Sequence, residues 1–176
     1  MRNYNMKRFL LSTLALVALA FGAQAQNFAL VDLEYILEQI PEYAAATQQM
    51  DALSEKYQKE VEAVASQAKT LYEEYQKTAS TLSAAQQSAK EEAIVAKEKE
   101  ASELRKKYFG QEGVIAEKQE ALFGPIEDSV YNAVKEVALE QGYDVVIDRA
   151  SAQSMIFASP RIDISNEVLA KLGYSN

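Results

Sequence analysis

The chain has no cysteine, no histidine and no tryptophan among its 176 residues. Without cysteine it can form no disulfide, carry no thiol nucleophile and accept no lipid on an N-terminal cysteine. Without histidine it also lacks the usual transition-metal ligand and the commonest general acid–base group. The sequence therefore predicts no enzyme and no cofactor. A metal site built from Asp144, Asp148 and Asp163 is the remaining alternative, although the first two are better explained as residues that flank a strand.

Proline is scarce, and residues 42–123 contain none. This interval is rich in Ala, Glu, Lys and Gln, and it predicts two long helices, residues 42–82 and 84–123. Each would span roughly 60 Å at 1.5 Å per residue. Nothing else in the chain is large enough to bury two such rods. We therefore expect an antiparallel helical hairpin that projects as an arm, residues 42–123.

Apolar residues recur on both predicted helices at coiled-coil spacing. The first helix has a seam with one eleven-residue step followed by regular heptads, formed by Met50, Leu53, Tyr57, Val61, Val64, Ala68, Leu71, Tyr75, Thr78 and Leu82. The second has one apolar residue every seven positions, namely Ile94, Ala101, Tyr108, Ile115 and Leu122. The intervening seam positions of the second helix are mostly polar. The pattern predicts a hairpin with a thin apolar contact rather than a thick core.

Two glycines, Gly110 and Gly113, fall inside the second predicted helix. Each would cost about 1 kcal/mol relative to alanine in a helix interior. They either allow close packing of the two helices or form a hinge near the root of the arm. On the hinge interpretation, alanine at both positions should stiffen the arm and raise its melting temperature. Farther on, Gly124 and Pro125 predict a kink or a new start of the helix.

The N-terminus has the pattern of a signal peptide, residues 1–25. Arg2, Lys7 and Arg8 form a basic head, residues 9–21 are apolar, and Ala23-Gln24-Ala25 matches the small-x-small cleavage site. The apolar run is short for a membrane span. We therefore expect export, cleavage after Ala25 and no stable membrane insertion. An uncleaved anchor is the alternative.

The charge is strongly negative. The chain has 18 basic and 26 acidic residues, and removing the three basic residues of the signal peptide leaves 15 basic residues and a net charge of −11. This sign argues against nucleic acid and anionic membrane surfaces as partners.

The remaining residues, 26–41 and 124–176, predict a small body of strands and short helices. Strands are expected at 27–31, 143–148 and 154–158, with helices capped by Asp32 and Ser165. The fold class is thus α+β, mostly α. Because so small a sheet exposes apolar edges, we expect a homo-oligomer rather than a monomer. The residues predicted to join its subunits are Phe28, Leu30, Val145, Ile147, Ile156 and Phe157.

Several segments resemble the Skp/OmpH family of periplasmic chaperones. Residues 28–37 are similar to the family's opening strand and helix, while 142–148, 155–160 and 163–169 resemble its closing strands and last helix. The resemblance implies a homotrimer whose arms surround a cavity. It further implies that unfolded outer-membrane β-barrel proteins are held there without ATP, in the periplasm, and that no active site exists.

The arms depart from the basic members of that family. The first has seven acidic and four basic residues, and the second eight and seven. This balance argues against lipopolysaccharide binding, and the basic concentration on the second arm is better explained by ion pairs than by a client-binding patch. Tyr72 lies off the seam and is a stronger candidate for client contact. The candidate client-binding residues are Tyr72, Lys97, Arg105, Lys106 and Lys107.

A structural or adaptor coiled coil that binds a folded partner in the cell envelope is the alternative function. Apolar residues outside the seams at the arm tip would favour it, but residues 80–88 are small and polar.

Overall fold

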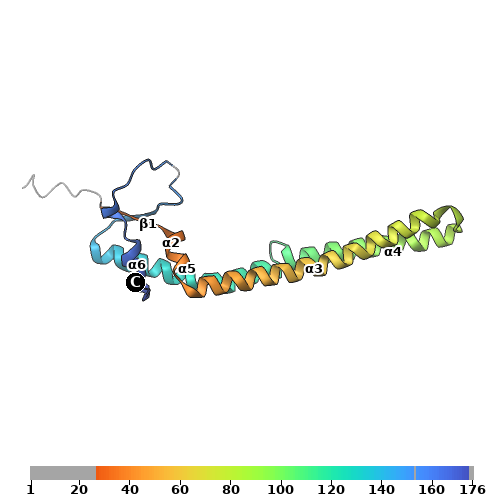
Figure 1. The fold of residues 1–176 in the computed structure, drawn as a ribbon, viewed down its shortest axis with the longest axis horizontal. Coiled ribbons are helices and arrows are strands. Elements are labelled where there is room, and N and C mark those ends of the chain that lie inside the picture. Colours follow the sequence, from red (N-terminus) through yellow and green to blue (C-terminus); the bar gives the residue numbers. More distant parts are fainter. Residues whose placement is uncertain (1–26, 153, 175–176) are drawn as a thin grey trace, which may run out of the picture.

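A computed structural model describes residues 27–152 and 154–174, and it shows a long two-helix arm standing out from a small body (Figure 1). The mostly helical class with a projecting hairpin is confirmed. The predicted signal peptide lies outside the described residues. In chain order the elements are β1 (Phe28–Val31), α2 (Leu33–Glu38), α3 (Pro41–Thr78), η1 (Ala79–Thr81), α4 (Ala84–Phe109), α5 (Val114–Gln141), β2 (Val145–Asp148), η2 (Pro160–Ile162) and α6 (Ser165–Leu172).

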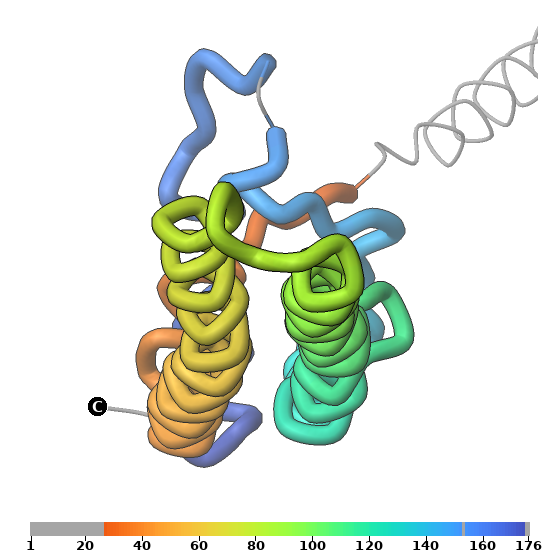
Figure 2. The backbone as a smooth tube through the Cα atoms, turned by 90° about the vertical axis from the view of Figure 1, so that its right-hand side faces the viewer, coloured from red at the N-terminus to blue at the C-terminus, as the bar shows by residue number. Residues whose placement is uncertain are grey.

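The arm consists of α3 running alongside α4 and the first part of α5 (Figure 2). Pro41 occupies the first position of α3, where its fixed φ favours the helix and its missing N–H costs nothing. At the tip, Ser83 and Gln86 form a capping box that starts α4: the Ser83 hydroxyl accepts from the Gln86 N–H, and the Gln86 side chain accepts from the Ser83 N–H. The sequence thus sets where α3 starts at the root of the arm and where α4 starts at its tip.

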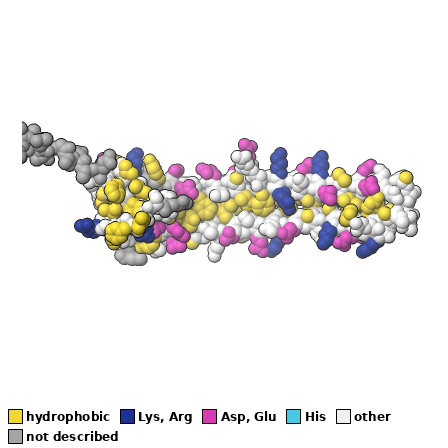
Figure 3. All heavy atoms as spheres, turned by 90° about the horizontal axis from the view of Figure 1, so that it is seen from above, with side chains coloured by type: hydrophobic (Ala, Val, Ile, Leu, Met, Phe, Trp, Pro, Cys, Tyr) yellow, Lys and Arg dark blue, Asp and Glu magenta, His cyan; other side chains and the backbone are white. Residues whose placement is uncertain are grey.

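The contact between the arm helices is thin, as the seam pattern predicts. Only Ala46, Met50, Val61 and Ala68 of α3 and Ile94 and Tyr108 of α4 are buried. Apolar side chains form a narrow band between the helices, with charged side chains on both edges (Figure 3). Because two helices bury only one stripe each, the arm has no enclosed core.

The second arm helix is interrupted, which the sequence interpretation missed. Gly110 and Gly113 lie between α4 and α5 rather than inside a helix, in a short loop that stands out from the arm (Figure 1). The loop folds tightly on the end of α4, because the Gly110 N–H donates to the Lys106 carbonyl and the Gly113 N–H to the Gly110 carbonyl, both at 2.9 Å. A Cβ on Gly110 would lie 2.3 Å from the Lys106 oxygen. Glycine is therefore required here by space.

The predicted new start of the helix at Gly124 and Pro125 is also wrong, because α5 runs through both residues. Near this point the Tyr43 and Phe123 rings meet edge to face at 5.3 Å between centroids. Helix α5 also packs against α6 in the body. Packing at both ends thus outweighs the hydrogen bond that proline removes, and α5 joins the arm to the body as one helix.

The body is built on parallel pairing of β1 with β2, in the register Phe28 to Val145 and Val31 to Asp148. Ala29 and Val31 face inward onto α5 and α6, while the next residues along β1 point to the other side. The core cluster comprises Ala29, Val31, Ile36, Ile40, Val130, Ala133, Val137, Ile164, Val168 and Leu169.

The strand predicted at residues 154–158 is absent from the described part of this segment. The free edge of β1 is occupied instead by the chain at Asp163 and Ile164, because the Ile164 N–H donates to the Leu30 carbonyl at 2.9 Å. Within one chain the 154–158 segment thus has no edge of β1 to pair with, whatever its β propensity.

Alanine substitutions at two glycines should have opposite effects on stability. Gly110→Ala should lower the free energy of unfolding by more than about 1 kcal/mol, because its Cβ would collide with backbone. Gly124→Ala should raise it by about 1 kcal/mol, because the position is helical and the nearest atom is the flexible Glu120 carboxylate. Urea unfolding followed by circular dichroism measures both. Stabilisation by Gly110→Ala would restore the hinge-in-helix interpretation.

Candidate functional site

A polar cluster fixes the root of the fold where β1, β2 and α6 meet. Asp32 caps α2 by accepting the Tyr35 N–H at 3.0 Å, and its other carboxylate oxygen pairs with the Arg149 guanidinium. Arg149 also lies 3.6 Å from the Asp163 carboxylate. The Tyr35 backbone donor, with Arg149 beside it, lowers the pKa of Asp32 below its ordinary value of 3.8.

Ser165 belongs to this cluster and does not cap the last helix as predicted. It is the first residue of α6, and it is buried. Its hydroxyl accepts the Asp32 N–H at 2.8 Å and donates to the Asp163 carboxylate at 2.6 Å, while Asp163 also accepts the Ser165 N–H. Ser165 thus ties the two ends of the chain together. The predicted position of the helix start is correct, but the Asp163 carboxylate, and not the Ser165 hydroxyl, accepts the first N–H of α6.

Two of the three carboxylates considered for a metal site, Asp148 and Asp163, have structural partners. Asp148 accepts the backbone N–H groups of Leu33 and Ser151 at 3.3 and 3.1 Å, and Asp163 holds Ser165. Across residues 27–152 and 154–174, no group of acidic side chains could hold a metal ion. No helix in those ranges is long and apolar enough to cross a membrane.

The residues predicted to join subunits lie around one side of the sheet. Phe28, Val145 and Ile147 are 38–53% exposed there, whereas Leu30 is buried beneath the 155–163 loop. Ile156 and Phe157 of that loop are 101% and 83% exposed. Such exposure of large apolar side chains is unusual for a folded monomer. A single chain therefore leaves this side of the body uncovered.

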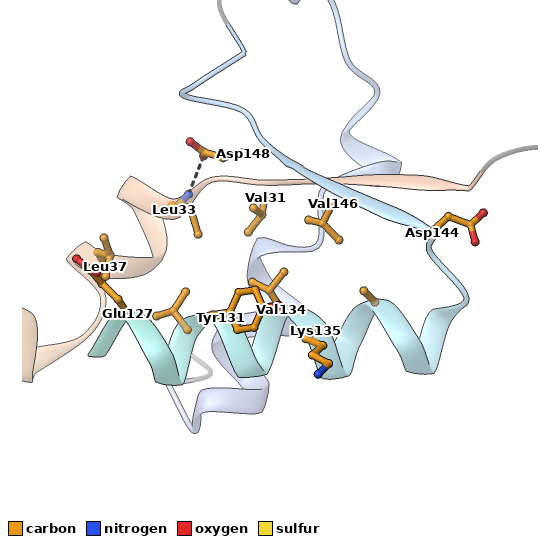
Figure 4. A pocket seen from close by; sticks show the side chains of 12 residues that line it. Val31, Leu33, Leu37, Glu127, Tyr131, Val134, Lys135, Asp144, Val146 and Asp148 are labelled. Atoms are coloured by element: carbon orange, nitrogen blue, oxygen red, sulfur yellow. Dashed lines mark hydrogen bonds between the residues drawn. The ribbon is translucent and has the colours of Figure 1, made fainter. Parts of the chain in front are cut away.

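The opposite side of the sheet forms an apolar groove of about 470 Å³ between β1, β2, α2 and α5 (Figure 4). Val31 and Val146 point from the strands toward Val134 and Tyr131 of α5, with Asp144 and Lys135 at one end. No pattern within α5 predicts this opening, because the groove depends on how α2 sits against α5.

The candidate client-binding residues fall into separate places on the arm. Tyr72 and Arg105 line one shallow hollow of about 460 Å³ between α3 and α4. Lys106 and Lys107 line another beside the α4–α5 loop. Lys97 is engaged with Glu100 at 2.7 Å, as the ion-pair interpretation expects. The structure therefore brings Tyr72 together with Arg105, and Lys106 together with Lys107, in two separate hollows.

Sequence reasoning missed two exposed apolar residues of the arm, Val95 and Phe109, which are 60% and 43% exposed. Both lie off the seven-residue seam. Their position outside the seam was the sequence signal that could have identified them as exposed. By contrast, Tyr57 and Tyr108 stack at 4.1 Å between ring centroids, and the Tyr108 hydroxyl donates to Glu60 at 2.6 Å. The nearby Glu60 carboxylate raises the pKa of Tyr108. These two seam tyrosines pack the arm and are not available as contact points.

A long two-helix arm on a small mixed body is the fold of a known class of chaperones. A solved structure of a candidate outer membrane chaperone (OmpH-like) from Caulobacter crescentus superposes with a TM-score of 0.62, at 11% identity, covering 86% of each chain. At that identity the likeness shows the fold alone.

The sequence comparisons establish the family. Residues 27–172 match the family model "Outer membrane protein (OmpH-like)". The chain is 30% identical over 169 residues to "Chaperone protein Skp" of Yersinia enterocolitica, covering 95% of this chain and 99% of that protein. The chain therefore belongs to the OmpH-like family, whose members are chaperones and not enzymes. The resemblance stated from the sequence is confirmed.

Asp32→Asn should reveal the contribution of the charged cluster through its pH dependence. Asparagine still caps α2 but cannot pair with Arg149 as an anion. Because the folded-state pKa of Asp32 is lowered, its stabilisation is present above 3.8 and is lost as pH falls through the lower folded value. The variant should be less stable than the wild type at neutral pH and equally stable in strong acid. Urea unfolding across pH measures this, with exposed Asp51→Asn as control; a pH-independent gap would contradict the assignment.

Proposed function

We propose that this protein is an ATP-independent holdase that binds unfolded outer-membrane proteins between its arms and prevents their aggregation. The single observation that carries the proposal is the arm itself, which extends clear of the body and encloses no core of its own (Figure 1). A projection of this size in a family of chaperones has no evident use except to reach around another molecule.

One arm cannot enclose a client, so the function needs several copies. The side of the body that exposes Phe28, Val145 and Ile147, together with Ile156 and Phe157, is the surface on which copies would join. We propose a homotrimer, as the family resemblance implies. In it, residues 154–158 gain from another subunit a strand edge to pair with.

The holding mechanism follows from the chemistry of client and arm. An unfolded β-barrel chain exposes alternating apolar side chains and unpaired backbone, which associate with other chains when they collide. Enclosure prevents those collisions, and many weak contacts allow clients of different sequence. No nucleotide is needed, because binding and release draw on these contacts alone.

The protein would act in the periplasm after cleavage of residues 1–25. The adaptor alternative receives less support, because the described tip, residues 79–88, exposes no large apolar side chain. A folded partner that binds at the arm ends would need large exposed apolar side chains there.

The mature protein should suppress aggregation of an outer-membrane β-barrel protein diluted from urea. We expect light scattering to fall to near the client-free level at one trimer per client, with the same result when ATP is added or omitted. Bovine serum albumin at equal mass controls for non-specific coating. Unchanged scattering would contradict the holdase proposal.

The double variant Ile156→Ser and Phe157→Ser should dissociate the trimer without unfolding the body. Both side chains are exposed in the single chain, so their loss removes little intramolecular packing. Light scattering with size-exclusion chromatography should give a threefold lower mass at an unchanged circular dichroism spectrum. Tyr131→Ser, exposed on the groove side of α5, is the matched control. A variant that keeps the wild-type mass would count against this interface.

A further inference from the structure

We propose that unfolded clients contact one particular face of each arm, the face that carries Tyr72, Val95 and Phe109. This inference rests on the proposed holdase function and adds to it the surface that does the binding. We call it the client face. Its occupant is an extended segment of unfolded polypeptide.

Helix geometry places the three side chains together. Val95, Ser102 and Phe109 are spaced seven residues apart on α4, so they follow one stripe of that helix. Ser102 lines the same hollow as Tyr72 of α3. The α4 stripe and Tyr72 therefore lie on the same side of the arm.

The other side of the arm carries small and charged side chains instead. The corresponding stripe of α4 carries Ala93, Glu100 and Lys107, also seven residues apart and all exposed. In α3, η1 and α4, the large apolar side chains with high exposure are Tyr72, Val95 and Phe109. Solubility of the arm does not require all three of these side chains to lie on one side.

The spacing of these side chains suits an extended chain. Val95 and Phe109 are fourteen residues apart, about 21 Å along the helix, which about six residues of extended polypeptide would span. The hollow between them is shallow and floored by Ala68 and Ala101. A folded partner would need a continuous patch of about 800 Å² on each side, and three separated side chains do not supply one.

Charges beside the hollow fit a variable client. Lys69 and Arg105 lie on its rim together with Glu98, so both signs are present within one site. Polar groups of either sign on an unfolded chain therefore find a complementary partner. Apolar anchors supply the binding free energy, and these rim charges add little specificity.

Site-specific photo-crosslinking tests the face directly. The full trimer would carry p-benzoylphenylalanine at Tyr72, Val95 or Phe109, or at the matched control positions Gln67, Ala93 or Glu100. Each would be mixed with a urea-diluted outer-membrane β-barrel protein and irradiated. We expect at least fivefold more client adduct from each client-face position than from its control.

Substitution provides a second measurement. The triple variant Tyr72→Ser, Val95→Ser and Phe109→Ser should bind the same client about tenfold more weakly, because three partly exposed apolar anchors are lost. The matched triple Gln67→Ser, Ala93→Ser and Glu100→Ser should bind within twofold of the wild type. Unchanged circular dichroism and trimer mass show that the variants remain folded.

The outcomes separate this inference from the function on which it rests. Equal crosslinking from both faces, by a wild type that suppresses aggregation, would overturn the client face and leave the holdase intact. Adducts only between arms, with or without client, would show that the face joins subunits and would also overturn it. A wild type that fails to suppress aggregation would remove the proposed function itself.

Discussion

The parallel pairing of β1 with β2 is the constraint on which the rest of the structure depends. It joins residues near the two ends of the described chain, and so it fixes where α3 leaves the body and where α5 returns. The Asp32–Arg149–Asp163–Ser165 cluster holds the same junction through charge-assisted hydrogen bonds. Without this root, two thinly packed helices would have no common base and no defined direction.

The arm and the body each bury only part of their apolar surface. The arm buries one narrow stripe on each helix, which keeps it long and leaves its sides available. The body buries one side of a two-stranded sheet and leaves apolar side chains exposed on the other side. Both arrangements leave apolar side chains exposed in a single chain, which suits the proposed homotrimer and its proposed clients.

Much of the fold follows from short-range patterns. The seams of residues 42–123, the Asp32 cap and Pro41 at the start of α3 each act through their neighbours in sequence, so they could be predicted. The incorrect predictions concern segments whose structure depends on contacts with residues far away in the sequence. Helix continuity through Pro125 depends on packing against α3 and α6, and the strand at 154–158 was lost because Asp163 and Ile164 occupy the edge of β1.

The sequence by itself determined a mostly helical hairpin on a small body, its acidic charge and its family, because periodicity and composition are local properties. Tertiary structure alone decided that α5 continues through Pro125, since packing against α3 and α6 holds the helix on both sides of the proline. It also decided which side of the arm carries Tyr72, Val95 and Phe109 together. That arrangement requires α3 and α4 to be set side by side in one register, and no spacing within either helix specifies it.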